Sequence, residues 1–176
     1  MANFDAFIKT LLKHEGGFVD HPNDPGGATN KGITMNTFKQ HAQSLLGVEP
    51  TLDNLKALTD EQAAKIYKKM YWDRIKGDDM QLQELAEIVF DFYVNAGANA
   101  SKLLQRVICD MGQQIAVDGG IGPATLRALN QLDQKEVYRR YKKGRLEYYQ
   151  NLCEKNPKLK VFLKGWTNRV NSFPDL

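Results

Sequence analysis

At 176 residues, with 42% of them hydrophobic and 26% charged, the chain can bury a sizeable core, either as one domain or with a small appended module. It has no apolar run of the roughly 18 residues that a membrane-spanning helix needs. It also has no apolar segment near Met1 of the kind typical of a secretory signal. We therefore expect a protein with no stable membrane insertion.

The charge is distributed unevenly. Residues 1–95 hold 10 Lys and Arg against 14 Asp and Glu, a net charge of −4, whereas residues 96–176 hold 14 against 7, a net charge of +7. Such a basic half attracts anionic polymers or surfaces over a long range. Nucleic acid is a competing partner, but the basic residues alternate with an apolar stripe and no nucleic-acid-binding motif is present. We expect no nucleic-acid partner.

A helix is predicted from about Phe4 to Glu15. Its apolar residues recur at the three- and four-residue spacing of one helical face, and Asn3 is a candidate N-cap. Gly16 and Gly17 end this helix, which places Glu15 in its last turn. The negative end of a helix dipole favours the uncharged form of a carboxyl group. Glu15 is therefore a candidate general acid, although Lys13 and His14, if close and charged, would favour its ionised form.

The segment 13–34 has five glycines, two prolines and no apolar period, so it cannot form a regular helix. A loop of this length inside a compact domain is usually either functional or disordered, and the amphipathic segments that closely flank it favour a functional loop. It carries Asp20 and Asp24, and an Asp close to Pro or Gly often only stabilises a turn. That explanation is the better one for Asp20, whereas Asp24 is also a candidate catalytic carboxylate.

The chain after this loop is predicted to be a succession of helices. Thr34 and Thr51 are candidate N-caps, and Thr59 with Gln62 has the pattern of a capping box that begins a helix extending to Tyr71 and Trp72. The further helices are expected at 82–96, at 99–111, from Pro123, from about Gln134 to the break at Asn156–Pro157, and at 161–170. We expect an all-α fold, with room for a small β-hairpin within residues 18–33.

Residues 82–96 form the most apolar of these helices, so this helix should be the buried central one. Asp91 and Asn95 are four residues apart and share one of its faces. Because buried polar groups need partners, both side chains could hold the glycine-rich loop, and Asn95 could also contact a ligand. Cys109 and Cys153 lie on separate predicted helices, so we expect them to be free thiols.

Five motifs, spread in order over nearly the whole chain, are similar to those of one enzyme family. They are Glu15–Phe18, Asp24–Thr34, Phe90–Gly97, Asp118–Thr125 and Gly165–Val170. Together they resemble the glycoside hydrolase family 108 N-acetylmuramidases, which are phage and bacterial lysozymes sometimes labelled secretion activators. The last two motifs resemble the C-terminal predicted peptidoglycan-binding module of that family. Phe18 stands where Tyr is commoner in the family.

The resemblance implies a lysozyme-like helical fold, with a catalytic region at 1–97 and a helical peptidoglycan-binding region at 98–176 packed against it. It implies cleavage of the β-1,4 bond between N-acetylmuramic acid and N-acetylglucosamine, with Glu15 as the catalytic acid. The partner is then the glycan strand of peptidoglycan, with no cofactor and a monomeric enzyme. Without an ordinary signal peptide, such an enzyme must leave the cytoplasm by another route to act at the cell wall or periplasm.

Glycoside hydrolysis also needs a second carboxylate or a positioned water on the other side of the sugar. The glycine-bent loop could present Glu15 and Asp24 to one cleft. The spacing of Glu15, Asp24 and Thr29 resembles the Glu–Asp–Thr spacing of phage-type lysozymes, although Thr34 is a second candidate for the threonine. Sequence does not give the carboxyl separation that distinguishes inversion from retention, and we slightly favour inversion. Tyr71 and Asn95 are candidate substrate-binding residues, although an aromatic residue such as Tyr71 more often lies in a core.

Two other functions remain open. The protein could be a peptidoglycan-binding or secretion-assisting protein without activity, or a metal-dependent wall amidase. A metal site could use His14 and His21 with Asp20 or Asp24. However, Phe18 stands where a His-Glu-x-x-His motif needs its second histidine, so we expect no metal site.

Overall fold

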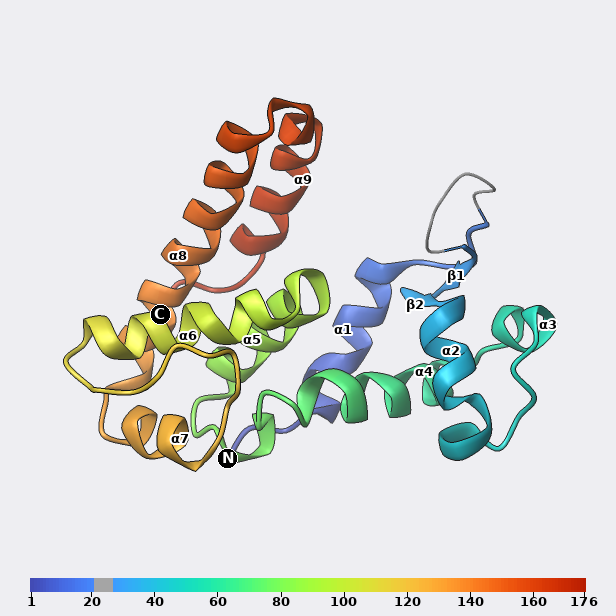
Figure 1. Cartoon of the computed structure of the whole chain (residues 1–176), viewed down its shortest axis with the longest axis horizontal. Coiled ribbons are helices and arrows are strands. Elements are labelled where there is room, and N and C mark those ends of the chain that lie inside the picture. The colour runs from blue at the N-terminus through green and yellow to red at the C-terminus, as the bar shows by residue number, and fades with distance from the viewer. Residues whose placement is uncertain (21–26) are drawn as a thin grey trace. The chain divides into compact units, whose positions relative to one another are not determined.

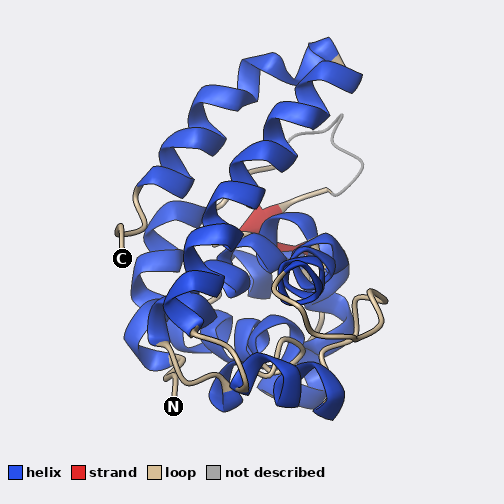
Figure 2. Ribbon diagram, turned by 90° about the vertical axis from the view of Figure 1, so that its left-hand side faces the viewer, coloured by secondary structure: helices blue, strands red, loops and turns tan. Residues whose placement is uncertain are grey.

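The computed structural model describes residues 1–20 and 27–176. It divides into two compact units, which we call the N-terminal unit (Phe4–Asp73) and the C-terminal unit (Met1–Asn3 with Arg74–Leu176). In the described ranges the regular elements are helical apart from one small two-stranded hairpin (Figures 1 and 2). The predicted all-α fold with a small hairpin is thus confirmed. The functional division at residue 97 stays a prediction.

The N-terminal unit begins with α1 (Asp5–Glu15), which buries Phe7, Ile8 and Leu11. The N-cap position of α1 is occupied by Phe4, which makes no side-chain cap, whereas the sequence predicted Asn3 there. The backbone N–H of Asn3 instead donates to Oε1 of Gln83 at 2.7 Å, and its carbonyl oxygen accepts from Nε2 of Gln83 at 2.9 Å.

Short elements complete this unit, and local capping explains where they begin. The hydroxyl oxygen of Thr34 accepts a hydrogen bond from the backbone N–H of Thr37, and Thr59 and Gln62 form the expected capping box. The elements are β1 (Thr29–Asn30), β2 (Ile33–Thr34), α2 (Met35–His41), the π-helical turn η1 (Ala42–Leu46), α3 (Leu52–Lys56), α4 (Asp60–Tyr67) and the π-helical turn η2 (Lys68–Trp72). Their fully buried side chains include Phe38, Leu55, Ile66 and Trp72.

The C-terminal unit is built on α5, which packs against α6 and α8. Apolar residues on most sides of α5 are buried, as expected for the central helix. The long helix α8 forms a hairpin with α9 (orange and red in Figure 1). The elements are η3 (Gly77–Asp79), α5 (Gln83–Ala96), α6 (Ala98–Asp110), α7 (Pro123–Asn130), α8 (Gln134–Lys155), η4 (Pro157–Leu159) and α9 (Lys160–Asn171).

The close packing of α8 against α6 depends on a glycine. Gly144, in the middle of α8, lets that helix approach α6, because a Cβ there would come 2.8 Å from Cδ1 of Leu103. Cys109 and Cys153 are free thiols, as predicted.

Across the described ranges, the structure contains no helix with the length and apolar character needed to cross a bilayer.

Candidate active site

Glu15 is the last residue of α1, and its side chain is half-buried. The helix ends here because Gly16 has a φ of +78°, a value that glycine adopts readily. The Gly16 N–H still donates to the carbonyl oxygen of Leu12 at 3.3 Å, which completes the last turn. The sequence prediction for the end of this helix is confirmed.

The β1–β2 hairpin has a two-residue turn formed by Lys31 and Gly32. Their φ values are +53° and +79°, and a type I′ turn needs positive φ at both positions. In the strands, Thr29 pairs with Thr34, and Asn30 pairs with Ile33. Because paired residues share a face of a hairpin, Asn30 and Ile33 together form its buried face.

Interactions with α3 and α4 fix the position of this turn. The side-chain amide of Asn30 donates to the carbonyl oxygen of Leu55 at 2.8 Å, near the end of α3. The Lys31 ammonium group pairs with Asp60 at 2.9 Å, in the first turn of α4. The backbone carbonyl of Lys31 accepts a hydrogen bond from the hydroxyl of Tyr67 at 2.8 Å. The hairpin is therefore held at both its strand and its turn.

Gly32 is the point where Glu15 and Tyr67 come together. A Cβ at this position would overlap the Tyr67 hydroxyl oxygen and would come 2.7 Å from Oε2 of Glu15. Tyr67 is fully buried, so its ring has little freedom to move aside. A residue without a side chain is needed here for the carboxyl and the phenol to approach the same backbone position.

Tyr67 was not among the residues predicted for the site. The sequence does indicate that Tyr67 is near the site. It precedes the predicted site residue Tyr71 by four positions, and residues four apart lie on the same face of a helix. The two rings have centroids 5.4 Å apart and planes inclined by 38°. Tyr71 is half-buried and lies in η2.

The two other predicted catalytic residues are Thr29 and Asp24. Thr29 is half-buried in β1, and its backbone exchanges hydrogen bonds of 2.7 and 2.8 Å with Val19. Thr34, the alternative candidate, uses its hydroxyl oxygen to accept from the Thr37 N–H at 3.2 Å, which confirms its role as a helix cap. Asp24 lies outside the described residues.

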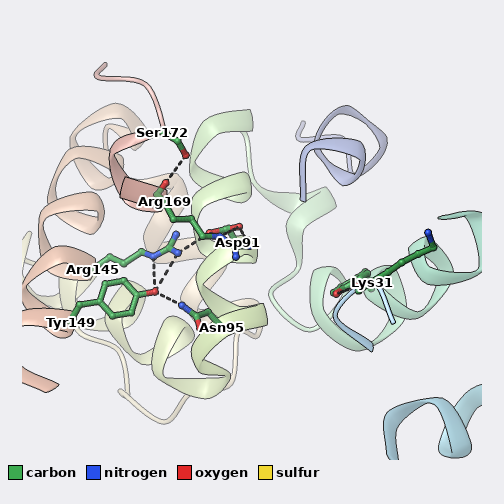
Figure 3. Close-up of polar contacts among 8 residues, drawn as sticks. Lys31, Asp91, Asn95, Arg145, Tyr149, Arg169 and Ser172 are labelled. Carbon is green, nitrogen blue, oxygen red and sulfur yellow. Dashed lines mark hydrogen bonds and ion pairs between the residues drawn. The ribbon is translucent and has the colours of Figure 1, made fainter. Parts of the chain in front are cut away.

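In the C-terminal unit, Asp91 is the centre of a buried ionic cluster (Figure 3). Its carboxylate is 1% exposed and accepts from Nη2 of Arg145 at 2.7 Å and from Nη2 of Arg169 at 2.6 Å. The Arg145 guanidinium also lies 5.0 Å from the ring centroid of Phe92. The prediction that Asp91 holds the glycine-rich loop is therefore wrong, because its carboxylate joins α5 to α8 and α9.

Asn95, a predicted substrate-binding residue, lies one turn after Asp91. Its side-chain amide donates to the hydroxyl oxygen of Tyr149, which also faces the Arg145 guanidinium (Figure 3). The residue itself is exposed at the end of α5. Its amide is thus oriented by α8 while the residue remains accessible to solvent.

The motif Asp118–Thr125 forms a turn before α7, as predicted. The buried side chain of Gln105 donates to Oδ1 of Asp118 at 3.1 Å and accepts from the Gly119 N–H at 2.8 Å. Hydrogen bonds from the Gly120 N–H and from Gln105 lower the pKa of the Asp118 carboxyl. This motif therefore has a structural role in the turn.

Among residues 1–20 and 27–176, no three His, Cys, Asp or Glu side chains are grouped so that they could hold a metal ion. His21 and Asp24, which a metal site in the loop would use, lie outside the described residues.

Comparisons with protein families give matches to both halves of the chain. Residues 8–97 match the family described as glycosyl hydrolase 108. The chain belongs to the glycosyl hydrolase 108 family. Residues 99–171 match the family described as predicted peptidoglycan domain. The two matches together support a peptidoglycan hydrolase, with peptidoglycan as its substrate partner.

A solved structure described as SagA of Brucella abortus is similar to this family member in both sequence and fold. The two chains are 33% identical, the match covers 97% of this chain and 90% of that chain, and the TM-score is 0.75. The lysozyme-like fold expected from the sequence is thereby confirmed. No curated protein sequence gives a significant match to the chain.

Proposed function

We propose that this glycosyl hydrolase 108 protein cleaves the β-1,4 bond between N-acetylmuramic acid and N-acetylglucosamine in peptidoglycan, and that Glu15 is the general acid. In this mechanism the Glu15 carboxyl donates its proton to the glycosidic oxygen as the bond breaks. The proposed place of action is the cell wall or the periplasm, where the glycan strands are found.

The observation that carries this proposal is the position of the Glu15 carboxyl against Gly32. A general acid must be held within hydrogen-bond reach of the oxygen that it protonates. The Glu15 carboxyl lies at the last turn of α1 and close to the hairpin turn at Gly32, which the buried Tyr67 hydroxyl also approaches. A half-buried carboxyl at this position is suited to donate its proton to one oxygen atom of a bound substrate.

We propose that Asp24 and Thr29 position the attacking water or stabilise the charge that develops on the sugar. Thr29 lies on the hairpin that also carries Gly32, so the proposal places it on the element that lies close to the Glu15 carboxyl. Asn95 and Tyr71 are proposed to contact the sugar rings. Attack of a positioned water would give inversion at the anomeric carbon.

The decisive experiment is the substitution Glu15→Gln, which keeps the shape of the side chain and removes its acidic proton. We expect the variant to fold as the wild type does and to lose wall-degrading activity by a factor of about 10²–10⁴ or more. Glu61→Gln is a matched control, because Glu61 is exposed in the first turn of α4, and it should keep full activity.

Mass spectrometry of digested peptidoglycan identifies which bond the enzyme cleaves. Products ending in reducing N-acetylmuramic acid are expected, and they should disappear with Glu15→Gln. Free stem peptides that vanish on chelation would instead show a metal-dependent amidase. Binding to the wall without any release of reducing sugar would show a protein that binds without cleaving.

A further inference from the structure

The tip of the α8–α9 hairpin, which we define as residues 155–164, carries an exposed apolar pair. The side chains of Val161 and Phe162 are 79% and 53% exposed. They lie in the first turn of α9, directly after η4. Figure 1 shows this end of the hairpin extending beyond α5, α6 and α7 of the same unit. The pair is therefore presented on a projection rather than in a groove.

Exposed lysines flank the apolar pair in the sequence of this tip. Among residues 154–164 there are four lysines and a single acidic residue, Glu154, which gives this stretch a net charge of +3. All four lysines are exposed: Lys155, Lys158, Lys160 and Lys164. The tip thus combines an apolar centre with a positively charged rim.

The apolar pair has a firm support. The Phe162 ring stacks on Trp166 at a centroid distance of 5.6 Å, and Trp166 stacks on Tyr149 at 4.9 Å. Tyr149 is 2% exposed and belongs to the core of the unit. Asn156 caps η4 by accepting from the Lys158 N–H at 3.3 Å, which fixes the turn. Ordering the tip on binding therefore costs little conformational entropy.

We propose that this tip binds the surface of an anionic phospholipid bilayer. Val161 and Phe162 enter the boundary between headgroups and acyl chains. The lysine ammonium groups pair with the lipid phosphates, while the methylene groups of the same side chains contact the acyl chains. A glycan strand offers mainly hydroxyl and amide groups with small, scattered C–H and methyl surfaces, so an aliphatic side chain such as Val161 finds no continuous hydrocarbon layer there. The charge and the apolar pair together therefore favour a bilayer over a wall polymer.

This binding is peripheral and reversible, and it goes beyond the proposed hydrolase function. Two apolar side chains and a few lysines give a weak anchor, whose strength depends on anionic lipid and on salt. Its effect would be to keep the enzyme at the bilayer surface next to its polymer substrate.

The proposal can be tested with the full chain by co-sedimentation with vesicles. Wild type should sediment with vesicles that contain phosphatidylglycerol, remain in solution with pure phosphatidylcholine, and be released by added salt. Val161→Ser should lower the partition coefficient about tenfold, since a valine side chain then no longer leaves water. The pair Lys158→Glu and Lys160→Glu should lower it about tenfold or more.

Two matched controls separate the tip from general effects. Val117→Ser changes another exposed valine of the same unit, and Lys135→Glu changes an exposed lysine at the start of α8. Both should bind as the wild type does. Because Val161 is mostly exposed, its substitution should leave the fold intact, which circular dichroism checks. The fluorescence of Trp166 should shift to shorter wavelength on binding, whereas Trp72 is fully buried.

Three results would overturn the proposal. One is that wild type does not bind anionic vesicles, and another is that Val161→Ser binds as well as Val117→Ser. The third is that isolated peptidoglycan, but not vesicles, competes for the tip, which would make it a wall-polymer site. All of these measurements are independent of Glu15, so they can fail while the proposed hydrolase activity holds.

Discussion

The carboxylate of Glu15 lies so close to Gly32 that a Cβ at position 32 would come 2.7 Å from Oε2. The contact joins the end of the first helix to the turn of the hairpin. Position 32 also has a φ of +79°, so glycine is favoured there for two independent reasons, the backbone conformation and the space.

We therefore expect Gly32→Ala to lower both the stability and the activity of the protein. The positive φ should cost about 1–2 kcal/mol of the free energy of unfolding. The new methyl group should also displace the Glu15 carboxyl or Tyr67, and a misplacement of this kind can lower kcat about 100-fold. Thermal unfolding and an assay of peptidoglycan cleavage measure the two effects.

Gly47→Ala is the matched control for this substitution. Gly47 has a φ of +68°, but a Cβ at this position would meet no atom within 4 Å beyond its chain neighbours. The variant should lose only the stability that the positive φ costs and should keep its activity. Equal activity of the two variants would contradict the role that we assign to Gly32.

The elements of this fold could be predicted largely because their boundaries are set by nearby residues. The hydroxyl oxygen of Thr34 accepts from Thr37, and Thr59 and Gln62 cap each other, so each signal lies within one turn of sequence. The end of α1 at Glu15 followed in the same way from the glycine after it. A candidate general acid could therefore be placed at a helix end from sequence alone.

The partners of these residues could not be predicted, because they are distant in the chain. Tyr67 contacts Lys31 across 36 residues, and the arginines that hold Asp91 are 54 and 78 residues away. The backbone of Asn3 likewise donates to the side chain of Gln83, 80 residues later in the chain. The spacing of apolar residues shows which face of a helix is buried, but it does not show which distant residues the side chains contact.

The ionic cluster at Asp91 leads to a second prediction. Asp91→Asn keeps the size of the side chain but leaves the buried Arg145 and the partly buried Arg169 without their counter-charge. Breaking a buried ion pair in this way costs about 3–5 kcal/mol of the free energy of unfolding. Chemical denaturation should show the loss directly.

Asp175→Asn provides the comparison. Asp175 is fully exposed, and its ion pair with Lys142 is open to solvent screening, so the denaturation midpoint should hardly change. If Asp91→Asn were as stable as Asp175→Asn, the cluster would not be what joins α5 to α8 and α9.

A third prediction concerns pH and rests on Glu87 in α5. Burial raises the pKa of the Glu87 carboxyl from 4.5 to about 7; a hydrogen bond with Gln83 opposes this shift and the charge of Glu84 adds to it. Between these two values the unfolded chain has lost the proton while the folded protein still holds it. The contribution of Glu87 to the free energy of unfolding therefore falls as the pH rises from 4.5 to about 7, and it is constant outside that interval.

Glu87→Gln should remove this dependence, because the amide stays uncharged at every pH. We expect the variant to match the wild type near pH 4 and to have a higher melting temperature near pH 8, with a flatter profile between. Glu147→Gln, at an exposed position of α8, should follow the wild-type profile throughout. A wild-type melting temperature that rose through this interval, with no difference in Glu87→Gln, would mean that the Glu87 carboxyl is already ionised in the folded protein at neutral pH.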